Sequence, residues 1–408
     1  MPLKVLLFSS LFPSAARPRH GIFVETRLRQ LVRDCAIDVR VVAPVPWFPS
    51  SAEIFGAYAK LAATPRRDLR ADDLRVSYPR YLMLPKFGVP FQPDSMAFAA
   101  AADIRELKRS GWVPDIIDAH YLYPDGVAAA LLAERLEVPF VITARGTDVN
   151  VLGKMAGPAR RIVWAAERAA AVVAVSTRLK EALVAMGVDE SKVVVLRNGV
   201  DLDVFGLQDQ GLSRVRLGLP PGRLAVCVGN LLAEKGQALA IESLPHLPDV
   251  HLAIVGDGPM REALQTLASR LGVDARVRFI PTMLQKELRH LYAAADVLLL
   301  SSTREGWPNV VLESLACGTP VVSVDVGGVG EMLTEPGVGR IVAGREPSDF
   351  AAAVAAMLLG AAPREQIRRH AARFDWGTIS RAQSDLFSRA LSRADTLGVG
   401  GVAATPCR

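Results

Sequence analysis

The sequence of 408 residues has few of the features that mark membrane-spanning, secreted or metal-binding proteins. No uninterrupted apolar run reaches the roughly eighteen residues that a helix needs to cross a bilayer. The first ten residues contain only a short apolar run without a small-residue cleavage site, so we expect no signal peptide. Four cysteines without metal or disulfide spacing fit a reducing cytoplasm and are expected to be packing or tail residues: Cys35, Cys227, Cys317 and Cys407.

Common signatures of catalysis and cofactor binding are also missing. The six histidines have no ligand spacing, and there is no G-x-S-x-G, no paired cysteine and histidine, and no G-x-x-x-x-G-K-[ST] loop. Gly256-Asp-Gly258 lacks the third glycine of a dinucleotide-binding loop, because Arg261 stands there. Asp201-Leu-Asp203 resembles a metal-binding D-x-D, but at a junction in the chain aspartate is simply a good turn residue. We therefore expect neither a metal nor a cofactor.

The composition is typical of a globular protein with two domains. Hydrophobic residues make up 50% and charged residues 22% of the chain, and its length is too great for one core. Residues 1–200 contain 27 Lys and Arg against 20 Asp and Glu, whereas residues 201–408 contain 21 against 22. The positive first half favours an anionic acceptor or an anionic membrane surface as a partner, and we expect no nucleic acid.

Basic and aromatic residues in this half could form such a surface. An apolar and basic face suits a lipid-linked substrate or peripheral membrane contact, and a solvated face with a modest excess of arginine fits equally well. The candidates are Arg66, Arg67, Arg70, Lys86, Arg105, Lys108 and Arg109, with Trp47, Phe48, Phe55, Tyr58, Phe87 and Phe91.

Short apolar runs alternate with helical segments in the first half, which predicts a doubly wound parallel sheet. Polar residues directly follow several runs, at the strand ends where such sheets bind ligands. These residues are His120, Arg145, Asp148 and Asn198. We expect the strands at 4–8, 37–43, 116–119, 140–143, 171–175 and 193–196.

Three further features of this half are interpreted from local chemistry. Gly21, at the start of a helix expected over 22–33, would let backbone N–H groups approach a phosphate, or is a plain turn residue. Ser176 is expected to cap a helix over 177–186. Residues 44–95 are rich in proline and aromatic residues and are expected to be irregular.

The pattern breaks between residues 205 and 221 and then starts again, which predicts a second doubly wound unit over about 206–375. Its strands are expected at 224–228, 251–255, 277–280, 297–300 and 321–324. The last segment, 375–390, is expected to be a helix. In two-lobed folds a terminal helix often crosses back to the first lobe.

The stretch from Asp296 to Asp325 contains two carboxylates, Glu305 in a loop and Glu313 in a helix that begins near Asn309. A break at 306–308 would let Glu305 fold back over the helix N-terminus, which attracts anions. Two acceptors for sugar hydroxyls would then lie beside an anion site. Spacing alone favours the alternative, in which both glutamates are solvated on the surface.

Lys235 and Gly236 follow the first strand of the second half. A lysine beside a glycine that enters a helix suits a diphosphate, because it combines a point charge with backbone donors. The loop of Glu305 follows a later strand of the same unit, so we expect these groups at the same edge of the sheet.

In combination, these segments resemble the retaining glycosyltransferases of family 4. The resemblance rests on V-G-N-L-L-A-E-K-G, I-V-G-D-G-P, and E-G-W-P-N-V-V-L-E-S-L-A-C-G-T-P-V-V with its E-x7-E spacing. N-G-V-D and L-F-P-S-x5-H-G-I-F-V add to it. H-Y-L-Y-P-D-G and A-R-G-T-D are similar to the branch that builds bacterial cell-surface and teichuronic-acid-type polysaccharides.

The resemblance implies a GT-B fold, with two Rossmann-like doubly wound lobes, a cleft between them and a C-terminal helix that crosses back to the first lobe. Residues 1–200, with a crossover helix at 376–395, would bind the acceptor. Residues 206–375 would bind the nucleotide sugar.

The resemblance also implies roles for individual residues. Glu313 would hold the ribose hydroxyls, Glu305 the hydroxyls of the donor sugar, and Lys235 the diphosphate. Gly21 would contact a phosphate and His120 the transferred sugar. We predict Glu305, His120 and Lys235 as catalytic. The backbone of Gly306, Trp307, Pro308 and Asn309 would meet the sugar or the diphosphate.

Two positions depart from the family pattern. Asn230 stands where the family commonly has arginine, so one positive charge that would face the phosphate is missing. Lys235 would then supply more of the positive charge. Arg145 stands where histidine is frequent, and would compensate.

The prediction for function is a retaining, metal-independent glycosyltransferase that moves a hexose from a nucleotide diphosphate sugar to a lipid-linked or polysaccharide acceptor. We expect it in the cytoplasm, with peripheral contact to the inner face of the membrane through the basic lobe. The alternatives are a nucleotide-sugar epimerase of the same fold and a non-catalytic sugar-nucleotide sensor.

Overall fold

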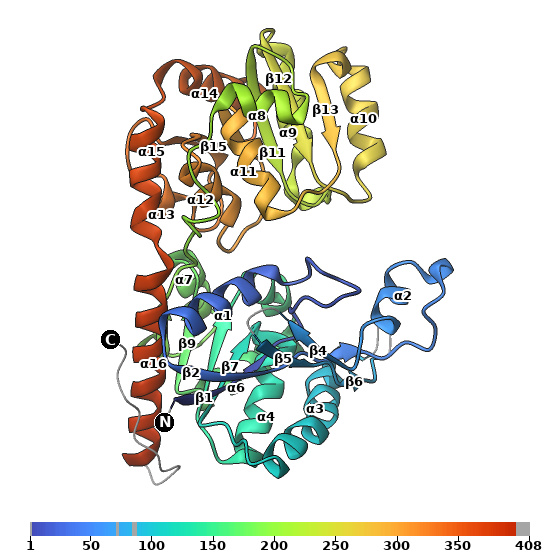
Figure 1. The fold of residues 1–408 in the computed structure, drawn as a ribbon, viewed down its shortest axis with the longest axis vertical. Coiled ribbons are helices and arrows are strands. Elements are labelled where there is room, and N and C mark those ends of the chain that lie inside the picture. The colour runs from blue at the N-terminus through green and yellow to red at the C-terminus, as the bar shows by residue number, and fades with distance from the viewer. Residues whose placement is uncertain (1, 71–72, 84–87, 397–408) are drawn as a thin grey trace. The chain divides into compact units, whose positions relative to one another are not determined.

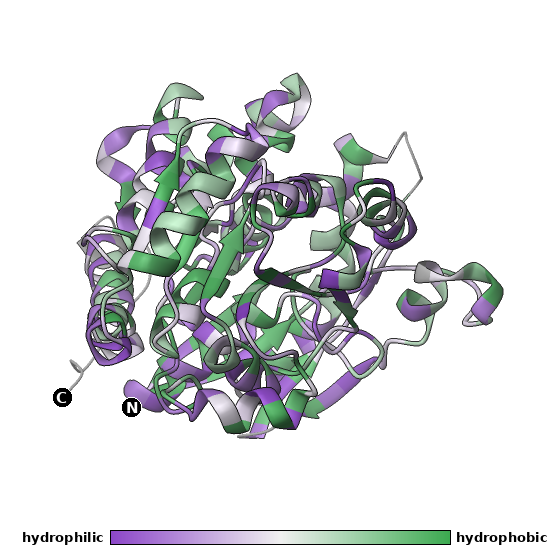
Figure 2. Ribbon diagram, turned by 90° about the horizontal axis from the view of Figure 1, so that it is seen from above, coloured by the Kyte–Doolittle hydropathy of each residue, from purple (hydrophilic) through white to green (hydrophobic). Residues whose placement is uncertain are grey.

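The apolar runs of the sequence form the strands of two separate sheets (Figure 1). The computed structural model describes residues 2–70, 73–83 and 88–396. Their contacts divide the chain into unit 1, within residues 1–197 and 376–408, and unit 2, within residues 198–375. Figure 2 shows strands coloured mainly as hydrophobic, and helices that carry both colours, as expected for helices with one solvent-exposed face.

Unit 1 contains an eight-stranded sheet whose strands are all parallel except the edge strand β4. Its central strands are buried along their whole length, which is typical of a parallel sheet covered on both faces. In spatial order the strands are β10 (Val193–Val195), β9 (Ala171–Ala174), β8 (Phe140–Ala144), β7 (Ile116–His120), β1 (Leu3–Phe8), β2 (Ile37–Val42), β5 (Leu74–Ser77) and β4 (Arg67–Arg70).

Helices connect these strands, and the predicted cap is confirmed: the Ser176 hydroxyl accepts a hydrogen bond from the backbone N–H of Leu179. The helices of unit 1 are α1 (Ile22–Asp34), α2 (Ala57–Ala62), α3 (Gln92–Arg109), α4 (Val127–Leu136), α5 (Thr147–Asn150), α6 (Ala156–Arg168), α7 (Thr177–Ala185) and α16 (Trp376–Thr396).

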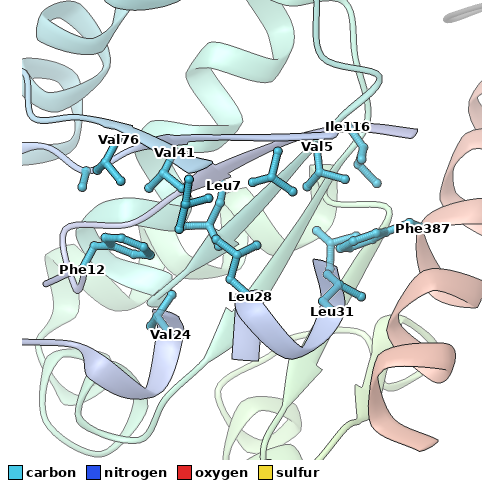
Figure 3. Packing of buried hydrophobic residues seen from close by; sticks show 14 of the residues in the cluster. Val5, Leu7, Phe12, Val24, Leu28, Leu31, Val41, Val76, Ile116 and Phe387 are labelled. Atoms are coloured by element: carbon cyan, nitrogen blue, oxygen red, sulfur yellow. The ribbon is translucent and has the colours of Figure 1, made fainter. Parts of the chain in front are cut away.

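The C-terminal helix α16 belongs to unit 1, although all of unit 2 precedes it in the sequence. Phe387 is fully buried and lies in the same apolar cluster as Leu28 and Leu31 of α1 and Val5 of β1 (Figure 3). The predicted return of a terminal helix to the first lobe is therefore confirmed, and apolar packing against α1 explains it.

Unit 2 contains a six-stranded, fully parallel sheet. In spatial order its strands are β13 (Val277–Ile280), β12 (Val250–Val255), β11 (Arg223–Val228), β14 (Val297–Leu300), β15 (Val321–Val324) and β16 (Gly339–Val342). Its helices are α8 (Gln210–Leu217), α9 (Gln237–Glu242), α10 (Arg261–Arg270), α11 (Gln285–Ala294), α12 (Asn309–Ala316), α13 (Val329–Met332), α14 (Pro347–Gly360) and α15 (Arg364–Ala371).

Each sheet has one strand at which the direction of winding reverses. In unit 1, β1 lies between β2 and β7, and in unit 2, β11 lies between β12 and β14. Ligands of doubly wound sheets bind at the carboxyl ends of the strands beside such a switch point. The loops after β1 and β7, and those after β11 and β14, are therefore where the fold places a site.

The prediction that residues 44–95 are irregular is wrong. They contain α2, the hairpin of β4 and β5 that extends the sheet, and a small sheet of β3 (Val45–Pro46) and β6 (Arg80–Tyr81). These strands are only two to four residues long, and β4 is half exposed, so they lack the apolar signal of the central strands. Helix α8 was also missed, within the break between 205 and 221.

The structure shows the surroundings of the cysteines and of the Asp201-Leu-Asp203 motif, from which we expected no disulfide and no metal site. Cys35, Cys227 and Cys317 are buried thiols outside any disulfide, as packing residues would be, and Cys407 lies outside the described residues. The Asp201 carboxylate accepts hydrogen bonds from the backbone N–H groups of Asp203 and Val204, so it shapes a turn. In the part of the chain that the structure describes, no helix is both long enough and apolar enough to cross a membrane.

Two phenylalanines test the docking of α16. We expect Phe387→Ala to lower the free energy of unfolding of unit 1 by about 3–5 kcal/mol, because it leaves a cavity in a fully buried cluster. Phe98→Ala on α3 is the control, because this ring is 80% exposed and should cost less than about 0.5 kcal/mol. Urea titration followed by circular dichroism measures both, and equal effects would contradict the assignment of α16 to the core of unit 1.

Candidate functional site

The loops after β11 and β14 bring a cation and a carboxylate together at the switch point of unit 2. Lys235 Nζ lies 2.6 Å from Glu305 Oε1, and their side chains are 30% and 12% exposed. Ser302 donates a second hydrogen bond, of 2.7 Å, to the same carboxylate oxygen. The sequence predicted that these two groups would meet at one edge of the sheet, and Ser302 is a partner that it missed.

Gly236 explains how the two loops come so close. Its backbone has a φ of 62°, and a Cβ atom at this position would lie only 2.1 Å from the carbonyl oxygen of Ser301. Any side chain would therefore push the Lys235 loop away from the Glu305 loop, and only glycine adopts this conformation without strain. Arg345, in the loop after β16, donates to the carbonyl of Ser302 at 3.2 Å and adds positive charge beside this approach.

Glu313 lies inside unit 2 rather than on its surface. It is 9% exposed, and Tyr292 donates a 2.9 Å hydrogen bond to its Oε2. Burial raises the pKa of the Glu313 carboxyl from an ordinary 4.5 to about 7, although hydrogen bonds from Tyr292 and Gln285 oppose the shift. The reading of Glu305 and Glu313 as two solvated glutamates is therefore wrong for both.

The two glutamates occupy different surroundings. Among the described residues they have no hydrogen-bond partner in common, since Glu305 pairs with Lys235 and Ser302, whereas Glu313 bonds to Tyr292 and Gln285. The helix break between them accounts for this, because α12 begins only at Asn309. One carboxylate is held as an ion pair and the other lies in an apolar core, so their chemistry differs.

The segment from Gly306 to Asn309 forms the turn into α12. Gly306 accepts a 3.1 Å backbone hydrogen bond from Gly328, and Pro308 is the N-cap residue of α12. The Asn309 Oδ1 accepts a 3.2 Å hydrogen bond from Nδ2 of Asn198, at the start of unit 2. Trp307 is 7% exposed and its ring centroid lies 6.1 Å from that of Phe374. The side chains of Trp307 and Asn309 thus pack against the two ends of unit 2, and the backbone of the turn remains the predicted ligand contact.

Asn230, the predicted departure from the family pattern, lies in the loop after β11. Its side chain is exposed, and its carbonyl accepts a 3.1 Å hydrogen bond from Gln237 of α9. Lys235 lies in the same loop, one short 3-10 turn further on. The arrangement agrees with a loop in which the lysine supplies the positive charge.

In unit 1, Gly21 is required by close packing. It has a φ of 69° at the N-cap of α1, and a Cβ atom there would lie 2.2 Å from the backbone carbonyl of Leu11. The loop after β1 therefore folds tightly against the start of α1. His20, beside it, is bonded through Nε2 to the carbonyl of Ser10 at 3.1 Å, and burial lowers its pKa to about 4.

His120, at the end of β7, is buried and has partners at both ring nitrogens. Its Nε2 lies 3.2 Å from Asp118 Oδ2, and its Nδ1 is hydrogen-bonded to the guanidinium of Arg145. Arg145 also lies over the ring of Phe23, with Cζ 5.3 Å from the ring centroid. Burial is the main reason that the pKa of His120 falls to about 4, so the ring is neutral at neutral pH.

Asp148 and Asp125 hold the surrounding loops. The Asp148 carboxylate accepts from the backbone N–H groups of Leu122, Arg145 and Gly146 at 2.7–3.1 Å, so it fixes the turn that carries Arg145. Asp125 accepts a 3.0 Å hydrogen bond from the Ser10 hydroxyl, and burial raises its pKa to about 7. Asp125 was not singled out from the sequence, although it lies in the same polar turn as His120.

Two doubly wound units, each with its own switch point, are the architecture of the GT-B fold. Residues 60–204 match the family described as Glycosyltransferase Family 4, and residues 212–374 match Glycosyl transferases group 1. The chain belongs to the family 4 glycosyltransferases. It is therefore an enzyme, a hexosyltransferase as the sequence predicts.

Individual relatives agree with this assignment. A Bacillus subtilis (strain 168) protein named as the teichuronic acid biosynthesis glycosyltransferase TuaC is 34% identical over 338 residues, which cover 81% of this chain and 83% of the relative. A D-inositol 3-phosphate glycosyltransferase of Mycobacterium bovis (strain BCG / Pasteur 1173P2) is 31% identical over 332 residues, or 76% of this chain and 68% of that protein. The similarity to glycosyltransferases of this family thus extends over most of the sequence.

Solved structures show the same fold at low sequence identity. Sucrose-phosphate synthase from Thermosynechococcus elongatus has a TM-score of 0.77 at 18% identity and covers 96% of this chain and 100% of its own. HepE of Anabaena, in complex with UDP-glucose, has a TM-score of 0.72 at 22% identity and covers 95% of this chain and 100% of its own. The predicted GT-B fold is confirmed.

The buried carboxyl of Glu313 predicts a pH dependence of stability. Its pKa is raised in the folded protein, so ionisation between pH 4.5 and about 7 costs the folded state free energy. Glu313→Gln stays neutral and keeps an acceptor for Tyr292. We expect the stability of this variant relative to the wild type to rise by up to about 3 kcal/mol between pH 5 and pH 8, measured by urea unfolding.

The same substitution at Glu262, an exposed residue of α10, is the control and should have little effect at any pH. A stability difference between Glu313→Gln and the wild type that stays constant from pH 5 to pH 8 would show that Glu313 is not buried as a neutral acid.

Proposed function

We propose that this enzyme transfers a hexose from a nucleotide diphosphate sugar to a saccharide or lipid-linked acceptor, with retention at the anomeric carbon and without a metal ion. The observation that carries the proposal is the Lys235–Glu305 ion pair at the switch point of unit 2. It combines a diphosphate-binding cation with an acceptor for sugar hydroxyls in one half-buried place. The UDP-glucose in HepE of Anabaena, a protein of the same fold, supports a nucleotide-sugar donor.

In this proposal unit 2 binds the donor. Lys235 donates to the diphosphate, and the backbone from Gly306 to Asn309 adds the partial positive charge of the α12 N-terminus. Glu305 accepts hydrogen bonds from the donor sugar, and Glu313 accepts from the ribose hydroxyls. Asn230 faces the diphosphate without adding charge, so Lys235 carries most of the charge compensation.

Unit 1 binds the acceptor in this proposal. Gly21 lets the start of α1 approach a phosphate, and His120, with Arg145 bonded to its ring, acts on the transferred sugar. The relative named as a teichuronic acid biosynthesis glycosyltransferase supports a bacterial cell-surface polysaccharide as the acceptor class. A cytoplasmic location stays a prediction.

Charge separation determines the mechanism. Breaking the bond between the anomeric carbon and the phosphate oxygen leaves negative charge on the diphosphate and an oxocarbenium-like sugar ring. Fixed donors aimed at the leaving group therefore lower the barrier most. The acceptor hydroxyl attacks from the face that the phosphate leaves, and a phosphate oxygen takes its proton. No enzyme nucleophile is needed, so Glu305 orients the sugar rather than forming a covalent intermediate.

The test begins with the donor. A thermal-shift series with UDP-, GDP- and ADP-sugars identifies it, since a ligand at a hundred times its dissociation constant stabilises a protein by about 2.7 kcal/mol. With that donor, Lys235→Ala and Glu305→Ala should each lower kcat at least a hundredfold, because each removes a group that acts on the transition state. Release of nucleotide in the presence of acceptor is the measurement.

Lys180→Ala is the matched control. Lys180 Nζ lies 3.1 Å from Glu190, and its side chain is 27% exposed, close to the 30% of Lys235, but it belongs to α7 of unit 1, whereas the proposed donor site belongs to unit 2. It should keep wild-type activity. Wild-type rates in both Lys235→Ala and Glu305→Ala would overturn the site assignment. An epimerised donor formed without acceptor, or donor binding without nucleotide release, would instead identify one of the alternative functions.

A surface of unit 1 supports membrane contact as a further part of the proposal. Residues 47–62, here called the α2 arm, extend away from the main sheet of unit 1 (Figure 1). Its apolar side chains are largely in solvent: Ile54 is 88% exposed, Trp47 51%, Tyr58 49% and Phe55 45%. The ring of Phe48 stacks on Tyr58 at 5.1 Å between centroids, which gives the arm a firm apolar face.

Part of the predicted basic set is exposed on unit 1. Arg66 and, on α3, Arg105, Lys108 and Arg109 are exposed. The rest differ, because Arg70 pairs with buried Glu25 and Arg67 pairs with Glu106, whereas Lys86 and Phe87 lie outside the described residues. The exposed apolar arm and the exposed basic residues together suit a bilayer with anionic lipids.

Vesicle binding tests this surface. The wild type should sediment with phosphatidylglycerol vesicles and less with phosphatidylcholine vesicles, and the double variant Ile54→Asp, Phe55→Asp should lose most of this binding. Leu359→Asp on α14 of unit 2 is the control, because Leu359 is 79% exposed and lies outside the arm. Equal binding by the double variant and the wild type would reject the α2 arm as a membrane contact.

A further inference from the structure

A chain of five polar side chains crosses the interior of unit 1. Arg27 of α1 donates from Nε to Gln383 Oε1 of α16 at 2.7 Å, and Gln383 Nε2 donates to Asp118 Oδ2 of β7 at 2.9 Å. Asp118 Oδ2 also lies 3.2 Å from His120 Nε2, and His120 Nδ1 is bonded to Arg145. We call these five residues the Asp118 network. Its members except Arg145 are no more than 3% exposed.

The two arginines at the ends of the network determine the direction of every hydrogen bond in it. A guanidinium only donates, so Arg27 requires an acceptor in Gln383, which places the amide nitrogen of Gln383 toward Asp118. At the other end Arg145 requires an acceptor at His120 Nδ1, which places the ring proton on Nε2. Both series of donors end at one oxygen, Asp118 Oδ2.

This geometry leaves His120 little freedom to act on a substrate itself. One ring nitrogen donates to Asp118 and the other accepts from Arg145, and the side chain is 1% exposed. The backbone carbonyl of His120 is occupied as well, because it accepts a 3.0 Å hydrogen bond from Ser9. Burial favours the neutral ring, in agreement with a histidine that neither takes up nor releases a proton near pH 7.

We propose that Asp118, Gln383 and Arg27 are positioning residues that hold His120 as the neutral Nε2–H tautomer, and that His120 acts on the reaction only through Arg145, whose guanidinium it fixes. The consequence for catalysis rests on the proposed function. The tautomer does not, and it can be measured in the absence of any substrate.

The Asp118 network also links α16 and the residues that follow β10 to His120. Gln383 is 265 positions from Asp118 in the sequence and reaches it only because α16 packs on α1. The Nη1 of Arg27 donates to the carbonyl oxygens of Leu196 and Arg197, both at 3.3 Å. Arg197 is the last residue of unit 1 before unit 2, and α16 begins with its first residue afterwards. The chain leaves unit 1 at Arg197 and re-enters it at α16. Hydrogen bonds through Arg27 therefore connect both of these segments to the network that holds His120.

Nuclear magnetic resonance of protein with 15N-labelled histidine measures the tautomer directly. His120 should give the signals of a protonated Nε2 and an unprotonated Nδ1, unchanged from pH 5.5 to pH 8, with His120→Gln used to assign them. A protonated Nδ1, or a titration within this range, would overturn the proposal. Gln383→Met, which is nearly isosteric, should shift the His120 signals, whereas Gln92→Met should not. Gln92 is the matched control because it also donates a 2.9 Å side-chain hydrogen bond, to Tyr81.

A double-mutant cycle then tests whether His120 acts through Arg145. We expect His120→Gln and Arg145→Met each to lower kcat tenfold or more with little change in the KM for the donor. The double variant should be no slower than Arg145→Met alone. Losses that multiply would show that His120 contacts the substrate independently and would overturn the proposal. A wild type without transferase activity but with the expected tautomer would reject the proposed function and leave the positioning of His120 intact.

Discussion

The parallel pairing of strands around β1 and around β11 is the constraint on which the rest of the structure depends. Because the neighbours of these strands run in the same direction, the loops that follow the strands all emerge at the carboxyl edge of each sheet. Lys235 and Glu305 are 70 residues apart and meet only because β11 and β14 are adjacent. His120 and Arg145 meet in the same way, at the ends of β7 and β8.

The charged side chains of the two proposed sites differ in how deeply they are buried. In unit 2 the Lys235–Glu305 pair is half-buried and remains open to exchange its partners for those of a ligand, which suits the diphosphate binding proposed for Lys235. In unit 1 the charges of the Asp118 network are almost wholly enclosed, where an unpaired charge is costly. Such a network holds one arrangement firmly, and it is suited to orienting groups rather than to exchanging protons.

Much of the fold could be predicted, because buried parallel strands leave a continuous apolar run such as Val297–Leu300. The short edge strands between 44 and 95 could not, since their stability comes from neighbours rather than from their own pattern. In the site, Lys235 and Glu305 were predictable from their places after strands. The partners Ser302, Tyr292 and Gln383 were not, because a polar residue in a helix or loop gives no sign of which carboxylate it faces.

The bond between Asn198 and Asn309 has a consequence for the free energy of ligand binding. It joins the first residue of unit 2 to the first residue of α12, while Trp307 packs against Phe374 near the last residue of that unit. Any ligand that stabilised these two contacts would therefore also stabilise both ends of unit 2. By thermodynamic reciprocity, whatever orders these ends would raise the affinity of the turn for such a ligand by the same factor.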